Sequence, residues 1–596
     1  MLKYQSSRKN SIVVNTVSRL KMLSEKLMKV KEFAFDTETN TLLVYGPRKE
    51  SKCVDITISW GDYDNYIIPV NHVYNYCLPK HIITKYLKPS FERTDITLIG
   101  HNLLFDMSVM YWLMGIRIKT HKLFDTEIAS WICDENREKG LKANTQQILG
   151  IDQTHIKDVF STVTAKEKKE NGLKANNKAT FDLVRLDVGA PYALDDSYFT
   201  WNLYLYYLDM LEEEEMDKIY YKTYPPFLHT LFNMSLKGIP VDTEKLKDIG
   251  EHIQQDLDEL LYKMIEITGV EFEPSSRQHL CQLLFGYSEG FKTPRTDLLD
   301  KSFHFPIQGT TKTGQPQTGV EVLKYLAKNP KKYTSKRKLE GIEVCKLLIE
   351  YSKLDKLKTS FVDGIFKTIY DDGKCHPQYQ PVGTDSGRIS CSKPNLMQLP
   401  NADEEEDKYL IRDCFIGSVD ENTGKRNHII SIDYSNLEVR VMAHFSQDEG
   451  LIKAFNEGKD LHGNTAKLMF RLACDANEVK KKYPDLRQQG KVIAFLLQYG
   501  GSSYTLYDDL NKDGALDNMA KQVQECYDKG IPLPSELEPF KGCTKGKDIA
   551  QRLMDIYFEA FPGIARFMRS QKKYAHRHKY VYKIGRAHVW TPVTAS

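Results

Sequence analysis

The chain has 596 residues, of which 41% are hydrophobic and 27% charged, so it has the composition of a folded protein with about three or four domains. The formal net charge is only +3, so a surface for nucleic acid has to come from local basic patches. The sequence has no run of 18 apolar residues, which argues against a membrane span, and no apolar segment after its basic N-terminus, which argues against a secretory signal. Its 11 cysteines include no Cys-x-x-Cys, which argues against a zinc ribbon and a disulfide framework. These features predict a reducing, cytoplasmic location.

The first part of the chain alternates between strands and helices. Runs rich in β-branched and aromatic residues predict strands, and amphipathic runs predict helices between them. The predicted elements, in chain order, are a strand over 11–17, a helix over 20–30 capped by Ser18, a strand over 32–39, a short strand and an apolar helix within 97–114, and an aromatic-rich helix over 191–215 that begins at Pro191. The acidic run Glu212 to Glu215 predicts a boundary, so we expect an α/β domain over residues 1–215.

The rest of the chain is predicted to be an α+β region. It is mostly helical to about residue 370 and again after residue 447, and residues 428–434 (HIISIDY) form its clearest predicted buried strand. Two stretches, 322–339 and 564–582, carry several Lys and Arg residues and no acid. One such stretch is typical of a solvated face, but two in one chain indicate a phosphate backbone as partner.

Four carboxylates of the first domain suit a metal site. Asp36 and Glu38 lie two apart on a predicted strand, so both point to one face, while Asp106 and Asp196 lie on two predicted helices. Crowded carboxylates repel each other unless a cation neutralises them, and hard divalent ions prefer oxygen ligands. Two such ions can activate a water and stabilise the leaving oxygen in phosphoryl transfer. Tyr192, one helical turn before Asp196, is placed to orient that water; the alternative is a structural ion cluster.

This order of carboxylates resembles the DnaQ-like 3′→5′ exonucleases of the DEDDy type, over about residues 10–210. The resemblance implies an α/β ribonuclease H-like exonuclease domain that binds Mg²⁺ in a two-metal site, with Mn²⁺ as the alternative ion. It further implies the metal ligands Asp36, Glu38, Asp106 and Asp196, with Tyr192 as the water-orienting group.

Longer motifs follow in the second part of the chain. They are, in chain order, LFNMSLKGIPVD (231–242), SSRQHLCQLLFG (275–286), TKTGQPQTGVEVL (311–323), YSKLDKLKTSFVD (351–363), GTDSGRISCSKPNLMQLP (383–400), IDYSNLEVRVMAHFS (432–446) and RQQGKVIAFLLQYGG (487–501). Over about residues 225–583 these motifs resemble the family A (DNA polymerase I-like) DNA polymerases. The resemblance implies an α+β right-hand polymerase domain over 216–583, with a thumb, part of a palm, and fingers.

A stripe of four residues suits a nucleoside triphosphate. Arg487, Lys491, Phe495 and Tyr499 recur every four residues, so they lie on one face of a predicted helix. Cations bind phosphate oxygens and aromatic rings contact sugar and base, whereas a plain amphipathic helix would place apolar residues in this stripe. By resemblance, Arg487 and Lys491 bind the triphosphate, Phe495 packs on the incoming nucleotide, and Tyr499 lies near the templating base.

Further site residues come from the neighbouring motifs. Asp433 ends the predicted strand 428–434 and faces a cleft, as a metal carboxylate should; the alternative is an Asp that caps the next helix. By resemblance, Asp433 is a catalytic metal ligand, Glu438 on the following turn excludes the sugar 2′-hydroxyl, and His462 contacts phosphate. Arg388 is implied to reach the primer terminus, where minor-groove acceptors are common to all base pairs.

Some features depart from the family pattern or fit it less closely. Asn395, Gln398 and Arg412 are weaker candidates for DNA contacts and suit structural roles equally. The predicted nucleotide helix has Ala494 and Leu496 where the family usually has Asn and Gly, and residues 508–546 form a predicted insertion.

The end of the chain raises a separate expectation. The family's motif C, His-Asp-Glu, does not occur in the sequence, and IGRAHVWTPVT (584–594) matches a translated sequencing adapter. We therefore expect residues 584–596 to be a non-native tail of a chain that is C-terminally truncated before motif C. We expect no 5′-nuclease domain before the exonuclease, an arrangement that resembles a phage replicative enzyme or a Klenow-like core.

The leading hypothesis is a template-directed DNA polymerase with a proofreading 3′→5′ exonuclease, acting in DNA replication in the cytoplasm, or in the host cytoplasm if it is a phage protein. Its expected partners are primer–template DNA, deoxynucleoside triphosphates, and a processivity factor or other replisome proteins, with no membrane. A stand-alone 3′→5′ exonuclease whose second half only binds nucleic acid is the main alternative, and a structural nucleic-acid-binding protein is the other. For this chain we expect Mg²⁺-dependent degradation of single-stranded DNA without primer extension.

Overall fold

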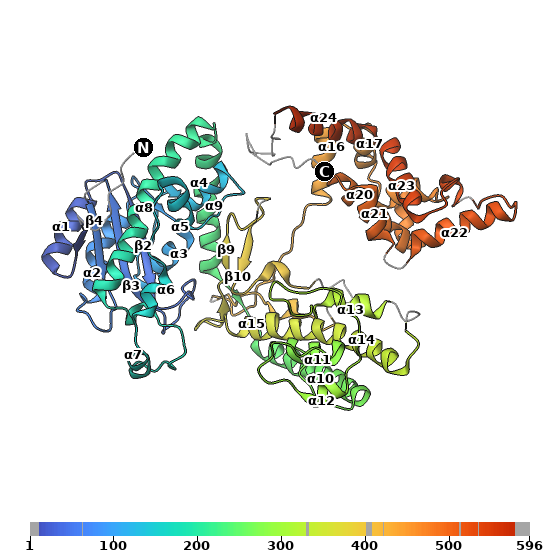
Figure 1. The fold of residues 1–596 in the computed structure, drawn as a ribbon. Helices are drawn as coiled ribbons and strands as arrows, with labels where there is room; N and C mark the ends of the chain where they lie inside the picture. Colours follow the sequence, from blue (N-terminus) through green and yellow to red (C-terminus); the bar gives the residue numbers. More distant parts are fainter. Residues whose placement is uncertain are drawn as a thin grey trace. The chain divides into compact units, whose positions relative to one another are not determined.

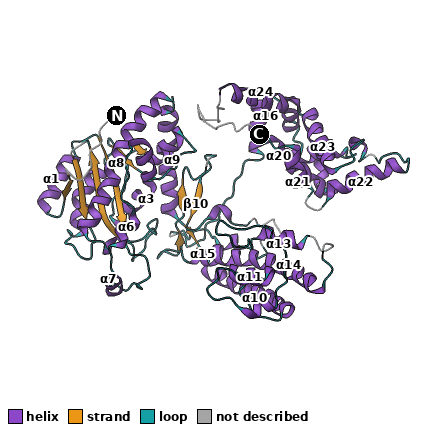
Figure 2. Cartoon of the chain, viewed as in Figure 1, coloured by secondary structure: helices purple, strands orange, loops and turns teal. Residues whose placement is uncertain are grey.

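The fold was analysed in a computed structural model that describes residues 11–61, 64–328, 333–384, 386–400, 408–420, 422–511, 514–534 and 536–578. The chain forms two compact units, one ending at Ile429 and the other beginning at Ile430. All strands of the described residues belong to the first unit, whereas the second is helical (Figures 1 and 2). Within the described residues, no helix is both long and apolar enough to cross a membrane.

A mixed six-stranded sheet forms the centre of the N-terminal domain. Its strands, in spatial order, are β1 (Ser11–Val13), β4 (Asp64–Pro69), β3 (Cys53–Trp60), β2 (Glu32–Thr39), β5 (Thr97–Gly100) and β6 (Leu123–Asp125). Strand β3 pairs antiparallel with β2 and β4, and the remaining pairs are parallel. This arrangement agrees with the ribonuclease H-like α/β fold expected from the sequence.

Alternation along β2 decides which side chains face the long helix α8 (Leu186–Glu213). Phe33 and Phe35 each pack edge-on against Phe91 of α2 (Lys80–Phe91), with ring centroids 5.1 Å apart. Because neighbouring residues of a strand point to opposite faces, Asp36 and Glu38 point away from α2. Helix α8 covers that other face, where Ser197 shares a hydrogen bond of 2.9 Å with Ser59 of β3 (Figure 1). The sheet therefore presents both carboxylates to α8.

Two helix starts differ from their predicted positions. Helix α1 (Val17–Leu27) is capped by Thr16, whose Oγ1 accepts a hydrogen bond from Arg19 N, so the predicted cap Ser18 lies inside the helix. Helix α8 begins five residues before Pro191. A proline near a helix start loses only one backbone bond, so the helix continues through it. Helix α8 ends at Glu213 and α9 (Asp217–Lys237) follows, so a break between two helices lies at the acidic run Glu212 to Glu215.

The remaining elements of the first unit are short strands and helices: α3 (Leu103–Ser108), a π-helical turn (Val109–Leu113), α4 (Thr126–Cys133), α5 (Leu141–Asn144), α6 (Ile156–Ser161), α7 (Ala165–Glu170), β7 (Ile239–Pro240), α10 (Thr243–Thr268), α11 (Arg277–Phe285), α12 (Thr296–Asp300), α13 (Val320–Ala327), α14 (Lys336–Lys356), α15 (Asp363–Phe366), β8 (Lys374–Cys375), β9 (Gln378–Gln380) and β10 (Ser390–Ser392). The mostly helical character predicted up to about residue 370 is confirmed.

A segment from the second part of the sequence packs on the N-terminal domain. Tyr370 and Tyr379 are buried in the same hydrophobic core as the six-stranded sheet. The hydroxyl of Tyr370 accepts a hydrogen bond from the backbone N–H of Tyr45, and Asp371 accepts one from the N–H of Lys49. The loop that follows the Asp36–Glu38 strand is therefore anchored to this segment.

The second unit is a helical body. It consists of α16 (Leu437–Ser446), α17 (Glu449–Asn456), α18 (Leu461–Phe470), α19 (Val479–Lys482), α20 (Pro484–Gln498), α21 (Ser503–Leu510), α22 (Ala515–Asp528), α23 (Gly546–Ala560) and α24 (Pro562–His578). The predicted insertion 508–546 is part of its core, because Leu516, Val523 and Phe540 are buried against the other helices. The predicted tail 584–596 lies outside the described residues.

The strand predicted over 428–434 is wrong. This segment is irregular, and Ile430, Ile432 and Tyr434 are 79%, 90% and 77% exposed. A strand requires a neighbour for its backbone N–H and C=O groups, and no described residue of the second unit forms a strand. Asp433 therefore lies in exposed, irregular chain rather than at a strand end. Glu438 lies in the first turn of α16 and not on a turn before it.

Candidate metal centre and nucleotide-binding face

Three carboxylates meet on the α8 face of the sheet. Asp36 and Glu38 of β2 and Asp196 of α8 each offer an oxygen, and these oxygens lie within 4.8 Å of one another. Asp196 is 9% exposed, and its Oδ1 has no hydrogen-bond partner among the described residues. A buried, unsatisfied carboxylate oxygen beside two other carboxylates fits a hard divalent cation. Tyr192 lies one turn before Asp196 on the same helix, as expected.

The electrostatics of this cluster favour a bound cation. Burial raises the pKa of Asp36, Glu38 and Asp196 well above the ordinary range. The next cause is a neighbouring carboxylate, which is Asp106 for Asp36, and Asp36 for both Glu38 and Asp196. Ionising any one of these groups is therefore unfavourable until positive charge is supplied.

Asp106 lies next to this cluster but is engaged elsewhere. It is buried in α3, and one of its oxygens accepts a hydrogen bond of 2.6 Å from Thr37 Oγ1. Thr37 follows Asp36 in β2, so its side chain points to the opposite face of the sheet. Burial raises the pKa of Asp106 to about 8. The structure thus brings three of the four predicted ligands together and places the fourth across the strand from them.

The end of β6 positions α3. Asp125 accepts hydrogen bonds from the backbone N–H groups of Asn102 and Leu103, at 3.2 and 2.8 Å. It also caps α4 through the N–H of Glu127 at 2.9 Å. One buried carboxylate therefore fixes the starts of both helices, and with them the position of Asp106.

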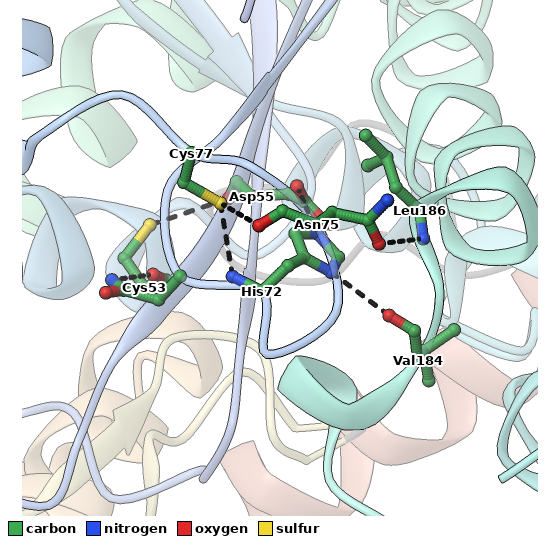
Figure 3. Close-up of polar contacts among 8 residues, drawn as sticks. Cys53, Asp55, His72, Asn75, Cys77, Val184 and Leu186 are labelled. Carbon is green, nitrogen blue, oxygen red and sulfur yellow. Dashed lines mark hydrogen bonds and ion pairs between the residues drawn. The ribbon is translucent and has the colours of Figure 1, made fainter.

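The start of α8 is held by the loop of residues 71–78 (Figure 3). His72 Nδ1 donates to the carbonyl oxygen of Val184 at 3.1 Å, and its Nε2 contacts both oxygens of the buried Asp55 at 2.9 Å. Asn75 Oδ1 accepts from the N–H of Leu186, the first residue of α8, at 2.9 Å. Asp55 is paired in register with Glu38, so the loop connects the strand that carries Asp36 and Glu38 to the helix that carries Asp196 and Tyr192.

Two functional features were not found from the sequence. The Asp55–His72 pair and the cation Lys142, whose Nζ lies 3.9 Å from the ring centroid of Tyr192, are absent from the predicted site. Neither belongs to a short motif. Lys142 stands alone in the sequence Gly-Leu-Lys-Ala-Asn, and only the fold brings it to the carboxylates.

In the second unit, α20 presents the predicted nucleotide stripe. A cavity of about 410 Å³ is lined by Lys491, Phe495 and Tyr499, together with Gln488, Val492, Leu496 and Asp509. Lys491 and Phe495 of α20 therefore line one cavity with Tyr499, the residue that follows the helix, whereas Arg487 is not among the lining residues. Leu496 lines the cavity, whereas Ala494 is buried in the helical core.

The other predicted residues of this face lie beside the cavity. Arg487 donates from Nη2 to Asp460 Oδ1 at 3.1 Å, and the Asp460 carboxylate also accepts from the N–H of His462 at 3.2 Å. The ring of His462 lies 5.6 Å from that of Phe495, and its buried Nδ1 has no partner among the described residues. Burial lowers the pKa of His462, and Arg487 lowers it further.

Glu438 belongs to the same face. Its carboxylate accepts a hydrogen bond from the hydroxyl of Tyr499. Two residues that are 61 positions apart and were predicted for sugar discrimination and for the templating base are therefore in direct contact. Asp433, in the exposed segment before α16, makes no part of the cavity lining.

The predicted DNA contacts of the first unit occupy two places. Arg388 is exposed in the connection between β9 and β10. Gln398 and Arg412 line a cavity of about 970 Å³ beside α10 and α14, whose lining also includes Lys263, Lys346, Lys353, Lys356 and Lys408. Arg412 donates to the carbonyl oxygen of Leu399 at 2.9 Å, and Asn395 Oδ1 is buried without a partner among the described residues. The basic stretch 322–339 is described except for residues 329–332, and 564–582 up to residue 578.

Comparisons with known proteins agree with both halves of this description. The profile of a 3′-5′ exonuclease domain matches residues 11–212, and that of DNA polymerase family A matches residues 243–533. The chain is 28% identical to DNA polymerase I of Chloroflexus aurantiacus, over 98% of the chain and 53% of the relative. It is also 28% identical to the DNA polymerase of Escherichia phage T5, over 93% of the chain and 60% of the relative.

A solved structure supports the fold. The POL domain of Pol1 from M. smegmatis, solved in complex with DNA primer-template and dNTP, aligns with a TM-score of 0.65 and 19% identity, over 98% of this chain and 82% of that one. The chain spans 53% and 60% of the length of the two curated relatives above. Residues 243–533 of the chain therefore belong to DNA polymerase family A, and residues 11–212 form a 3′-5′ exonuclease domain.

Proposed function

We propose that this protein is a template-directed DNA polymerase with a proofreading 3′→5′ exonuclease, and that the chain of 596 residues carries the exonuclease reaction on its own. The single observation that supports the exonuclease most directly is the meeting of Asp36, Glu38 and Asp196, with one oxygen of Asp196 left unsatisfied. We propose the domain bounds 1–215 for the exonuclease and 216–583 for the polymerase.

The proposed reaction is hydrolysis of the last phosphodiester bond at a DNA 3′ end, which releases a nucleoside 5′-monophosphate. Asp36, Glu38 and Asp196 would hold Mg²⁺ or Mn²⁺, and Asp106 is a further expected ligand. When bound, these ions would lower the pKa of a water and stabilise the leaving oxygen. The Tyr192 hydroxyl orients the attacking water.

A nuclease assay tests this proposal. With Mg²⁺, the purified chain should shorten 5′-labelled single-stranded DNA one nucleotide at a time, and both EDTA and Asp36→Ala should abolish the ladder. Asp187→Ala, which removes an exposed acid from the same helix as Asp196, should leave the rate unchanged. Cleavage that survives Asp36→Ala, or a labelled mononucleotide as first product, would contradict the proposed site.

The polymerase half of the proposal concerns the second part of the chain. We propose that Arg487, Lys491, Phe495, Tyr499 and His462 bind a deoxynucleoside triphosphate, supported by the cavity that three of them line. We also propose that Glu438 excludes the 2′-hydroxyl and that Arg388 and the basic groove beside α10 contact primer–template DNA. Processivity factors or other replisome proteins, and a cytoplasmic site of action in a bacterium or a phage-infected host, complete the proposal.

Deoxynucleotide binding separates this proposal from the alternative of an exonuclease with a nucleic-acid-binding second half, and primer extension tests whether the polymerase site of this chain is complete. The sequence holds Asp433 but no His-Asp-Glu motif, and Asp433 lies in exposed chain. Since phosphoryl transfer depends on positioned metal ions, this chain should bind primer–template DNA without extending it. Extension by the exonuclease-disabled Asp36→Ala chain would show that another carboxylate acts with Asp433. Deoxynucleotide binding that Lys491→Ala does not weaken would favour the alternative.

A further inference from the structure

Lys142 is a cation that the proposed mechanism does not use, yet it lies inside the exonuclease site. Its Nζ is 3.9 Å from the centroid of the Tyr192 ring and donates a hydrogen bond of 2.6 Å to the carbonyl oxygen of Thr154. A lysine over an aromatic face at this distance is attracted by the electrons of the ring. The ammonium group is therefore fixed between Tyr192 and the backbone rather than free in solvent.

The positive charge of Lys142 acts on the carboxylate cluster. It lowers the pKa of Asp36, Glu38 and Asp196, each of which burial and neighbouring carboxylates raise. In return, Asp196 is the carboxylate that raises the pKa of Lys142 most, against the lowering effect of burial. Lys142 is therefore a built-in counter-ion of the cluster.

One buried side chain, Asn144, holds the backbone next to Lys142. The buried Asn144 donates from Nδ2 to the carbonyl oxygens of Glu138, Lys139 and Gly140, each at 3.0 Å. Its Oδ1 accepts hydrogen bonds from Ser130 Oγ of α4 at 2.7 Å and from the Tyr207 hydroxyl of α8 at 2.6 Å.

This anchoring decides how far Lys142 can move. Helix α5, which carries Lys142 two residues before Asn144, is fixed both to α4 and to the helix of Asp196. A long side chain on a fixed backbone, with its ammonium group hydrogen-bonded, loses little further freedom when it acts on the site.

We propose that Lys142 is a positioning residue of the exonuclease site: its ammonium group, hydrogen-bonded to the backbone, holds the Tyr192 ring in place. This inference rests on the proposed exonuclease function and adds a residue to it. The ring whose hydroxyl orients water then remains in one position.

A positioning role predicts two changes. Lys142→Met keeps the length of the side chain and removes the charge. Its kcat for single-stranded DNA should fall about tenfold or more with little change in KM. Hydroxyl-radical labelling of Tyr192, measured by mass spectrometry, should rise about twofold or more because the ring loses the cation that covers it.

Two further variants complete the test. Lys142→Arg keeps the cation and should retain the parental labelling of Tyr192 and recover most of the lost kcat. Lys166→Met, the same substitution at a lysine that is 83% exposed on α7, should change neither quantity. Circular dichroism melts verify that each variant is folded.

The outcomes are distinct. A lower kcat with greater labelling of Tyr192 in Lys142→Met supports the inference. Unchanged labelling of Tyr192, or an unchanged kcat, overturns it. Because the labelling needs no DNA, absence of nuclease activity in the parent chain would refute the proposed function while the labelling still decides the effect of Lys142 on Tyr192.

Discussion

At the scale of single residues, protons and divalent cations compete for the same oxygens. Asp36, Glu38, Asp106 and Asp196 are all harder to ionise in the fold than in water, because burial and mutual repulsion penalise their charged forms. For such groups the contribution to stability is fully present below the unfolded pKa, near 4 for a carboxyl group, and is lost as the pH rises through the folded pKa. For Asp106 that loss is complete only above about pH 8.

This competition predicts how metal stabilises the protein. Without metal the exonuclease domain should be less stable at pH 8 than at pH 5, and Mg²⁺ should raise its Tm more at pH 8, by at least about 3 °C in thermal melts. Asp106→Asn should reduce the difference between the two pH values, since its amide is neutral at both. Glu170→Gln, at an exposed acid of α7, serves as the control. Equal Mg²⁺ shifts at both pH values would contradict this account.

The sequence was most informative about residues whose roles follow from local geometry. The two-residue spacing of Asp36 and Glu38 on an apolar strand predicted that both would face the same partner, and the fold confirms it. It could not predict that Thr37, on the opposite face, binds Asp106, because that contact spans 69 residues. Lys142 was missed for the same reason: its partners come from β2 and α8, and no spacing in the sequence connects them.

At the scale of elements, the predicted helix starts and the predicted strand were wrong where a second cap or a tertiary contact outweighed the local sequence signal. Ser18 and Thr16 are both good caps, and the helix begins after the earlier one. Pro191 suits a first turn, but contacts made by residues 184–186 with the loop of residues 71–78 start α8 earlier. The alternating residues 428–434 favour a strand, yet a strand exists only with a partner, and the described residues of the second unit provide none.

The loop of residues 71–78 leads to a prediction about α8. His72→Ala should lower the free energy of unfolding of the first unit by about 3 kcal/mol or more, because Asp55 would remain buried without its partner. Amide hydrogen exchange should become faster at the start of α8, where the Val184 carbonyl loses its donor. The control Lys21→Ala, which removes an ion pair of two exposed side chains on α1, should cost less than about 1 kcal/mol. Protection of α8 that stays at the parental level in His72→Ala would refute the proposed link.

At the scale of the whole molecule, the two compact units are continuous in sequence through an exposed apolar segment. Residues 428–434 have no regular structure, and Ile432 is 90% exposed. The loop of residues 71–78 is also exposed at Tyr76, at 69%, but it is tied down through His72 and Asn75. Exposure is similar at the two places, whereas the hydrogen bonding that resists local opening differs.

Limited proteolysis should reveal this difference. Chymotrypsin should cleave after Tyr434 before it cleaves after Tyr76, and mass spectrometry should first detect fragments that end or begin there. Tyr434→Gly should delay the first cut, whereas Tyr76→Gly should not. A first cleavage within the loop of residues 71–78 would show that its hydrogen bonds do not hold it closed.

The core shared by the N-terminal sheet and Tyr370, Tyr379, Val382 and Cys391 sets a limit on dissecting this protein. A fragment that ends at the proposed domain boundary, residue 215, would lack these four residues, so the side chains that contact them would be exposed to water. It would also lack Tyr370 and Asp371, which anchor the loop that follows β2. Exchanging exonuclease modules between such polymerases therefore means transplanting a discontinuous unit, residues 11–212 together with the strip around 370–391. The exonuclease domain of this chain is therefore one folded body that two separate stretches of sequence build.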